Sequence, residues 1–209
     1  MGLSAAFAPL RLGAWEVRVH GPGAMTRALR AVLAAVMVPE PDLPPLDVFI
    51  ADDGRARGVL HGEQAWHLTL PPRGRLAVLL GYVVGTATSL LRRFLFVHAA
   101  AIELHGRGCV LVGAPGAGKT AAAAVLLRNG GAYLSDEVAL LDPASGMLHP
   151  FAVPLAVKPW TAKAARTFPP ARQVASDAGV RYLLPSRRAS GAVPLDAVIL
   201  LDPAGPASA

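Results

Sequence analysis

The sequence predicts an α/β fold in which a phosphate-binding core follows a small α+β lobe. The first observation is the stretch VLVGAPGAGKT at 110–120, where an apolar strand pattern enters a glycine-rich loop. The second is the alanine-rich stretch after it, since alanine is the best helix former. The third is composition: 53% of the 209 residues are hydrophobic and 16% are charged, which is enough apolar material for a sizeable core and excludes a disordered chain.

The expected lobe covers residues 1–93. Alternating or continuous apolar residues predict its strands, and apolar residues at helical spacing predict its helices. A turn-rich stretch with Asp52, Asp53 and Gly54 joins two of the strands. The expected elements are strands at 15–20, 46–50 and 64–70 and helices at 24–38 and 75–93.

The expected core covers residues 94–209. Two strands at 94–104 and 108–113 flank a short turn and predict a hairpin whose second strand runs into the glycine loop. A helix follows the loop and stops at Gly130–Gly131. The remaining expected strands are 132–142, 155–158, 181–184 and 196–202.

The glycine loop carries the strongest chemical signal. Gly113, Gly118, Lys119 and Thr120 match the pattern G-x-x-x-x-G-K-[ST] in full. In such a loop backbone N–H groups bind phosphate, the lysine reaches the β- and γ-phosphates, and the hydroxyl coordinates Mg²⁺. The predicted nucleotide-binding residues are Gly113, Ala114, Pro115, Gly116, Ala117, Gly118, Lys119 and Thr120.

A carboxylate is required near the terminal phosphate, and the sequence offers two candidates. Asp136 and Glu137 follow the first strand pattern after the loop helix, whereas Asp202 ends a strand near the C-terminus. We favour the acidic pair, because two acids permit one metal-directed role and one proton-accepting role. By itself His98, on an apolar strand, is more typical of a core histidine than of a catalyst.

The segment HAAAIELHGRGCVLVGAPGAGKTAAAAVLLRNGGAYLSDEVALLD resembles the core of the HPr kinase/phosphorylase family and its shorter relatives, including kinases that phosphorylate a serine of modified-peptide precursors such as lasso peptides. The resemblance covers roughly residues 94–202 and implies a P-loop kinase core of the HPr kinase/PEP carboxykinase-like type. It implies that Asp136 is the general base and that His98 lies near the γ-phosphate. Glu137 would then help Thr120 to hold Mg²⁺.

The same resemblance makes Lys158 and Arg181 weaker candidates for substrate contact. A glutamate–isoleucine–arginine–glycine run typical of the bifunctional bacterial enzymes is absent from this chain. That departure argues against reverse phosphorolysis and against HPr itself as the substrate.

The charge of the chain is concentrated in one segment. Of its formal net charge of +6, residues 158–188 hold seven basic residues and one acid, Asp177. The segment is interpreted as a solvated surface, a surface for phosphate or an acidic peptide, or, with least support, a nucleic-acid surface.

A cytoplasmic location is expected. No basic leader opens the sequence, the single Cys109 excludes an intramolecular disulfide, and the uncharged stretch 76–91 is short for a membrane span.

Three functions remain open at this stage. The favoured one is a Mg²⁺-dependent kinase that transfers phosphate from ATP, or alternatively GTP, to a serine hydroxyl of a peptide or protein. The others are an ATPase or nucleotide switch, and a small-molecule kinase that acts on an acceptor such as free serine. A homo-oligomer is compatible with the sequence.

Overall fold

The computed structural model describes residues 9–13, 15–21, 23–39, 43–161 and 170–202. The fold is mixed α/β, with three α-helices among the described residues and most of the remaining structure in sheets. The chain divides into two compact units. Unit 1 holds residues up to Arg92 together with Val174–Gly179, and unit 2 holds Arg93–Gln173 and the residues from Val180 onward.

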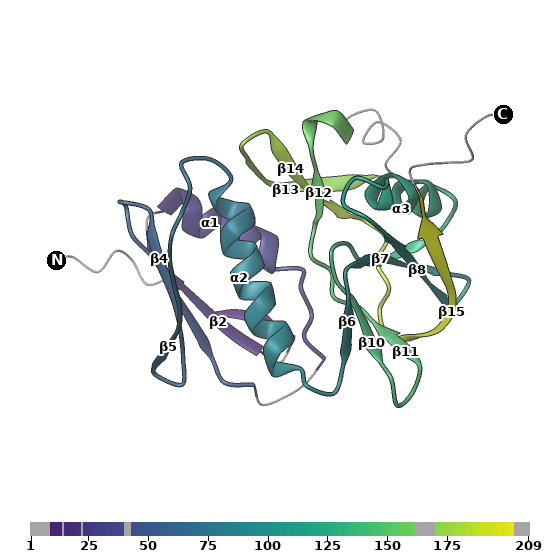
Figure 1. Cartoon of the computed structure of the whole chain (residues 1–209), viewed down its shortest axis with the longest axis horizontal. Coiled ribbons are helices and arrows are strands. Elements are labelled where there is room, and N and C mark those ends of the chain that lie inside the picture. Colours follow the sequence, from purple (N-terminus) through teal and green to yellow (C-terminus); the bar gives the residue numbers. More distant parts are fainter. Residues whose placement is uncertain (1–8, 14, 22, 40–42, 162–169, 203–209) are drawn as a thin grey trace. The chain divides into compact units, whose positions relative to one another are not determined.

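Unit 1 is built on one five-stranded sheet with two helices on one side of it (Figure 1). In space the strands follow their chain order, and β2 and β3 are parallel while the other neighbours are antiparallel. The strands are β1 (Leu10–Leu12), β2 (Trp15–His20), β3 (Leu46–Ile50), β4 (Arg55–Leu60) and β5 (Glu63–Thr69), and the helices are α1 (Gly23–Leu33) and α2 (Arg75–Leu90).

Alternation of side chains decides which face of this sheet is buried. Leu46, Val48 and Ile50 of β3 are buried, and Asp47 and Phe49 between them are only half-buried. A strand places successive side chains on opposite faces, so the first set faces the helices and the second set faces away from them.

Two expectations for unit 1 are wrong in detail. The helix expected at 24–38 ends at Leu33, because the N–H of Val38 donates a hydrogen bond to the carbonyl of Leu12 instead of continuing the helix. The turn after β3 is followed at once by β4, which lacked a clear apolar alternation in the sequence.

Unit 2 contains a seven-stranded sheet of mixed direction. Its spatial order is β6-β10-β11-β15-β8-β7-β9, and the parallel pair β8–β15 lies inside it. The strands are β6 (Leu95–Val97), β7 (Ala99–Leu104), β8 (Arg107–Gly113), β9 (Ala132–Ser135), β10 (Ala139–Asp142), β11 (Met147–His149) and β15 (Val193–Leu201).

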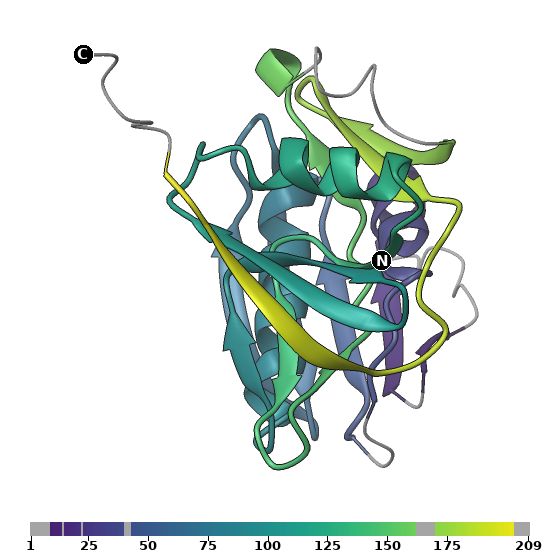
Figure 2. The ribbon, with the colours of Figure 1, turned by 90° about the vertical axis from the view of Figure 1, so that its right-hand side faces the viewer.

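A smaller sheet of order β12-β14-β13 and the helix α3 (Lys119–Arg128) are the other main elements among the described residues. Ala123 and Leu127 of α3 belong to one buried cluster with residues of both sheets, including Leu111 of β8 and Leu155 of β12. Figure 2 shows α3 alongside the larger sheet. The small sheet comprises β12 (Leu155–Val157), β13 (Ala171–Asp177) and β14 (Val180–Pro185), and a single 3-10 turn follows β12 at Pro159–Thr161.

Two stretches expected as single strands are each divided in two. The stretch 94–104 breaks at His98, because β6 pairs with β10 whereas β7 pairs with β8 and β9. The stretch 132–142 breaks at residues 136–138, where Glu137 has a φ of 78°. Strands β1, β11 and β13 were not expected from the sequence. Within the described ranges, no helix has the length and apolar character that crossing a bilayer requires.

Candidate functional site

The glycine loop, residues 113–120, connects β8 to α3 as the sequence predicts. A side chain at Gly113 would meet the carbonyl oxygen of Leu201 at 2.7 Å, so β15 approaches the loop too closely for any other residue. Gly116 and Gly118 have φ values of 87° and 93°, a backbone region that favours glycine. A Cβ at either position would meet no atom of the described residues within 4 Å, so that part of the structure leaves the loop open on this side.

Lys119 lies against the loop instead of extending into solvent. Its Nζ donates to the carbonyl oxygens of Gly113 at 2.8 Å and Ala114 at 3.3 Å, and the residue is buried. No side chain from the described ranges caps the N-terminus of α3, where Gly118 is the N-cap. An ammonium group and uncapped helix amides at one loop are the donors that bind an anion.

Asp136 reaches the same end of the sheet from β9. Because β7 is antiparallel to both β8 and β9, the strands β8 and β9 run in the same direction although β7 separates them. Asp136, the residue after β9, therefore lies on the side where β8 enters the glycine loop. Its Oδ2 accepts a hydrogen bond from the Thr120 hydroxyl at 3.2 Å.

The environment of Asp136 disfavours its ionised form. The residue is 2% exposed, and burial, followed by the negative charge of Glu137, raises its pKa from 3.8 to about 7. The hydrogen bond from Thr120 and the charge of Lys119 act in the opposite direction but do not compensate. A buried carboxyl with a pKa near neutrality can exchange a proton at working pH.

His98 and Glu137 form a second pair beside Asp136. The His98 Nδ1 lies 3.0 Å from the Glu137 carbonyl oxygen and 3.5 Å from its carboxylate. Both side chains are more than half exposed. The left-handed backbone at Glu137 is uncommon for a residue other than glycine, and it forms the turn that brings this contact about.

The structure brings some of the predicted site residues into contact, but not in all of the expected pairs. Thr120 contacts Asp136, whereas Glu137, expected beside Thr120, contacts His98. Asp202, the disfavoured candidate, directly follows Leu201, which pairs with Gly113 in the parallel β8–β15 ladder. Both carboxylate candidates thus follow strands that end at the loop side of the sheet.

The weaker candidates lie on the small sheet. Val157, the residue before Lys158, pairs with Arg181, so both basic residues lie at one end of that sheet. Of the basic segment 158–188, Arg187 and Arg188 are exposed. Lys163 and Arg166 lie outside the described residues.

Tyr133 is a residue of the site that sequence reasoning missed. It is fully buried in β9, and its hydroxyl donates to the carbonyl oxygen of Val153. Burial first, and then the charges of Asp136 and Glu137, raise its pKa well above the ordinary value. Tyr133 thus remains a neutral hydrogen-bond donor that anchors the strand carrying Asp136. Nothing in the pattern AYLS distinguishes it from an ordinary strand residue.

Comparison of the chain with protein-family models, with curated proteins and with solved structures finds no match. The described residues contain no group of three histidine, cysteine, aspartate or glutamate side chains arranged to hold a metal ion.

Proposed function

We propose that this protein is a Mg²⁺-dependent P-loop kinase that transfers the γ-phosphate of ATP to a serine hydroxyl of a peptide. The observation that carries the proposal is the contact between Thr120, in the first turn of α3, and the buried Asp136 carboxylate. It unites the motif residue expected to coordinate Mg²⁺ with the carboxylate expected to accept a proton. The peptide acceptor rests on the family resemblance of residues 94–202.

The loop offers the donors that a triphosphate requires. Phosphate oxygens can accept hydrogen bonds from the Lys119 ammonium and from the uncapped amides of α3. The open side of Gly116 and Gly118 leaves room for the phosphates. The Thr120 hydroxyl donates its hydrogen to Asp136, which leaves oxygen lone pairs for a cation. Mg²⁺ there would neutralise charge on the phosphate oxygens.

The transfer step needs one proton acceptor. The acceptor oxygen forms a bond to the γ-phosphorus, the bond from that phosphorus to the β,γ-bridging oxygen breaks, and ADP leaves. Asp136 takes the proton of the acceptor hydroxyl on Oδ1, because its Oδ2 is occupied by the hydrogen bond from Thr120. The pKa of about 7 allows the carboxyl to release this proton to water afterwards.

His98 and Glu137 have supporting roles in this proposal. Their exposed side chains lie beside Asp136, where they can contact the outer phosphate or the acceptor. Glu137 also sustains the raised pKa of Asp136 through its charge.

The test is incubation of the full chain with γ-labelled ATP or GTP, Mg²⁺ and serine-containing peptides, read by mass spectrometry. Phosphate on a peptide serine is expected, and Asp136→Asn should lower the transfer rate about 10²-fold or more while nucleotide affinity stays near that of the parent. Asp142→Asn is the matched control, because Asp142 ends β10, the next strand along the chain, and the substitution should leave the rate unchanged.

The products distinguish the alternatives. Free phosphate without phosphopeptide would show a nucleotide hydrolase, and phosphoserine formed from free serine would show a small-molecule kinase. Transfer at the parent rate by Asp136→Asn would disprove the role of Asp136 as base.

A further inference from the structure

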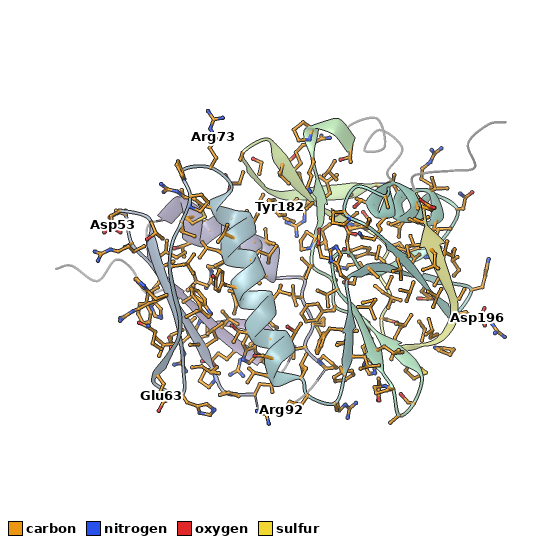
Figure 3. All side chains as sticks on the ribbon, viewed as in Figure 1. Asp53, Glu63, Arg73, Arg92, Tyr182 and Asp196 are labelled. Carbon is orange, nitrogen blue, oxygen red and sulfur yellow. The ribbon has the colours of Figure 1, made fainter. Side chains whose placement is uncertain are left out.

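The edge strand β5 of unit 1 is bordered by a hollow on each face. β5 ends the order of the five-stranded sheet, and no described strand pairs with its outer edge. An unpaired edge presents main-chain N–H and C=O groups that an extended peptide can bind. Figure 3 shows Asp53 and Glu63 at the two ends of the β4–β5 hairpin that carries this edge.

The hollow on the helix side is apolar and measures about 680 Å³. The Trp66 indole forms its aromatic part, fixed by a hydrogen bond of 3.1 Å from Nε1 to the Thr86 hydroxyl and by a ring contact with Tyr82. Tyr82 is 43% exposed although it is large and partly apolar. The lining residues are Leu60, Ala65, Trp66, Ala77, Val78, Gly81, Tyr82, Gly85, Thr86 and Ser89.

The α2 side of this hollow is long enough for a peptide strand. Ala77 and Ser89 mark its ends along the helix, a rise of about 18 Å at about 1.5 Å per residue. An extended chain covers that length with about five to six residues at about 3.3 Å each. Gly81 and Gly85 lie one turn apart within this stretch, and a Cβ at either would meet no atom within 4 Å. The missing side chains leave room for those of a ligand.

The hollow on the other face is basic and measures about 390 Å³. The Arg57 guanidinium lies 4.7 Å from the centre of the Phe49 ring, and no carboxylate of the described residues forms an ion pair with it. Gln64 and His67 of β5 also line this hollow, as does Arg55, which Asp53 already neutralises. Among the described residues no acidic one lines it, so its charge suits an anionic side chain.

We propose that the outer edge of β5 binds an extended segment of alternating apolar and acidic residues as a sixth strand. Alternate side chains of an added strand point to opposite faces, so one set would enter the apolar hollow and the other would face Arg57. This segment is the recognition segment of the acceptor peptide, an assignment that rests on the proposed kinase function. The acceptor serine would lie elsewhere in the same peptide.

The binding test needs no nucleotide. Fluorescein-labelled Val-Glu-Val-Glu-Val-Glu-Val is titrated with the full chain and followed by fluorescence anisotropy, beside the peptide with lysine at each glutamate position. The glutamate peptide should bind at least about tenfold more tightly, and N-methylation of its backbone should abolish binding because it removes main-chain donors. Equal binding of the two charged peptides, or no binding of either, would overturn the proposal.

Two variants test the two hollows separately. Gly85→Leu fills the apolar hollow and should lower affinity about tenfold or more, while its helical circular dichroism and melting temperature are retained, since leucine is the better helix former. Arg57→Glu should reverse the preference between the two peptides. Arg73→Glu is the matched control, because Arg73 is exposed outside both hollows (Figure 3) and should change nothing.

A transfer assay separates failure of this proposal from failure of the kinase function. Attaching the glutamate heptapeptide to a serine acceptor should lower KM with kcat unchanged. In the Gly85→Leu variant the attached heptapeptide should no longer lower KM. Peptide binding without any phosphoryl transfer would support the β5 site and refute the kinase function. Phosphoryl transfer with no decrease in KM would support the kinase function and refute the β5 site. The protein could instead form a dimer that the Gly85→Leu substitution dissociates, and bind neither peptide. That outcome would assign the outer edge of β5 to a second copy of the chain and refute the proposal.

Discussion

Asp136→Asn should stabilise the protein at neutral pH while it removes activity. A carboxyl whose pKa rises from 3.8 to about 7 on folding costs about 4 kcal/mol when it is ionised in the folded state, at about 1.4 kcal/mol per pKa unit. The folded state then binds more protons than the unfolded state between these two values. Stability of the parent therefore falls as the pH rises from about 4 to about 7.

Asparagine keeps the shape of the protonated carboxyl and has no charge to bury. The variant should gain stability over the parent, and the gain should grow by about 2 to 3 kcal/mol between about pH 5 and about pH 8. Urea unfolding at several pH values, followed by circular dichroism, measures the difference, and hydrogen exchange of β9 locates it in unit 2. Parallel pH profiles for parent and variant would refute the reasoning.

Asp142→Asn provides a control of opposite sign in the same unit. Burial opposes ionisation of Asp142, but hydrogen bonds from Ala144 and Ser145 and the charge of Arg93 outweigh it and lower its pKa. Its carboxylate is stabilising above the ordinary pKa, so the asparagine variant should lose stability at neutral pH and match the parent in acid. The same substitution of aspartate by asparagine should therefore stabilise the protein at Asp136 and destabilise it at Asp142 near neutral pH.

Two further predictions concern the affinity for the nucleotide and the kinetics with an acidic peptide. Lys119→Met should raise the Kd for a fluorescent ATP analogue about tenfold or more, because the ammonium that donates at the loop is lost, and an unchanged Kd would show that the nucleotide does not reach this loop. Reversal of the exposed Arg187 and Arg188 to glutamate should raise KM for an acidic acceptor peptide and weaken its salt dependence, whereas unchanged kinetics would leave them as solvated surface.

The core of the fold could be anticipated where local pattern and tertiary pairing agree. The β7–β8 hairpin, the glycine loop and α3 lie where alternation, glycine spacing and alanine content predict them. The strands β1, β11 and β13 could not, because LRL and MLH are too short to show a pattern and ARQVASD has no apolar alternation. Each is held by pairing with the strand next to it in the chain, across a short turn. The early end of α1 has a long-range cause, since the N–H of Val38 donates to the carbonyl of Leu12.

The candidate site, like the fold, could be predicted from the sequence only in part. The motif Gly113–Thr120 identified the loop, and the acidic pair identified the carboxylates. Their partners were not foreseen: Thr120 meets Asp136, and Glu137 meets His98. The two strands predicted through His98 and through Asp136 and Glu137 are each broken at the site. Periodicity alone does not show these breaks, because apolar residues resume directly after His98 and after Glu137.

The sequence by itself determined where the proposed phosphate-binding loop lies, because a glycine loop between a strand and a helix is a local structure that depends on nearby residues alone. Only the tertiary structure decided that the two strand breaks, at His98 and at Asp136–Val138, come together at one end of the sheet. The physical reason is that β6 and β10 pair with each other while β7 and β9 pair with each other, so the chain must turn at both breaks. That pairing buries Asp136 against Thr120 and raises the pKa of its carboxyl.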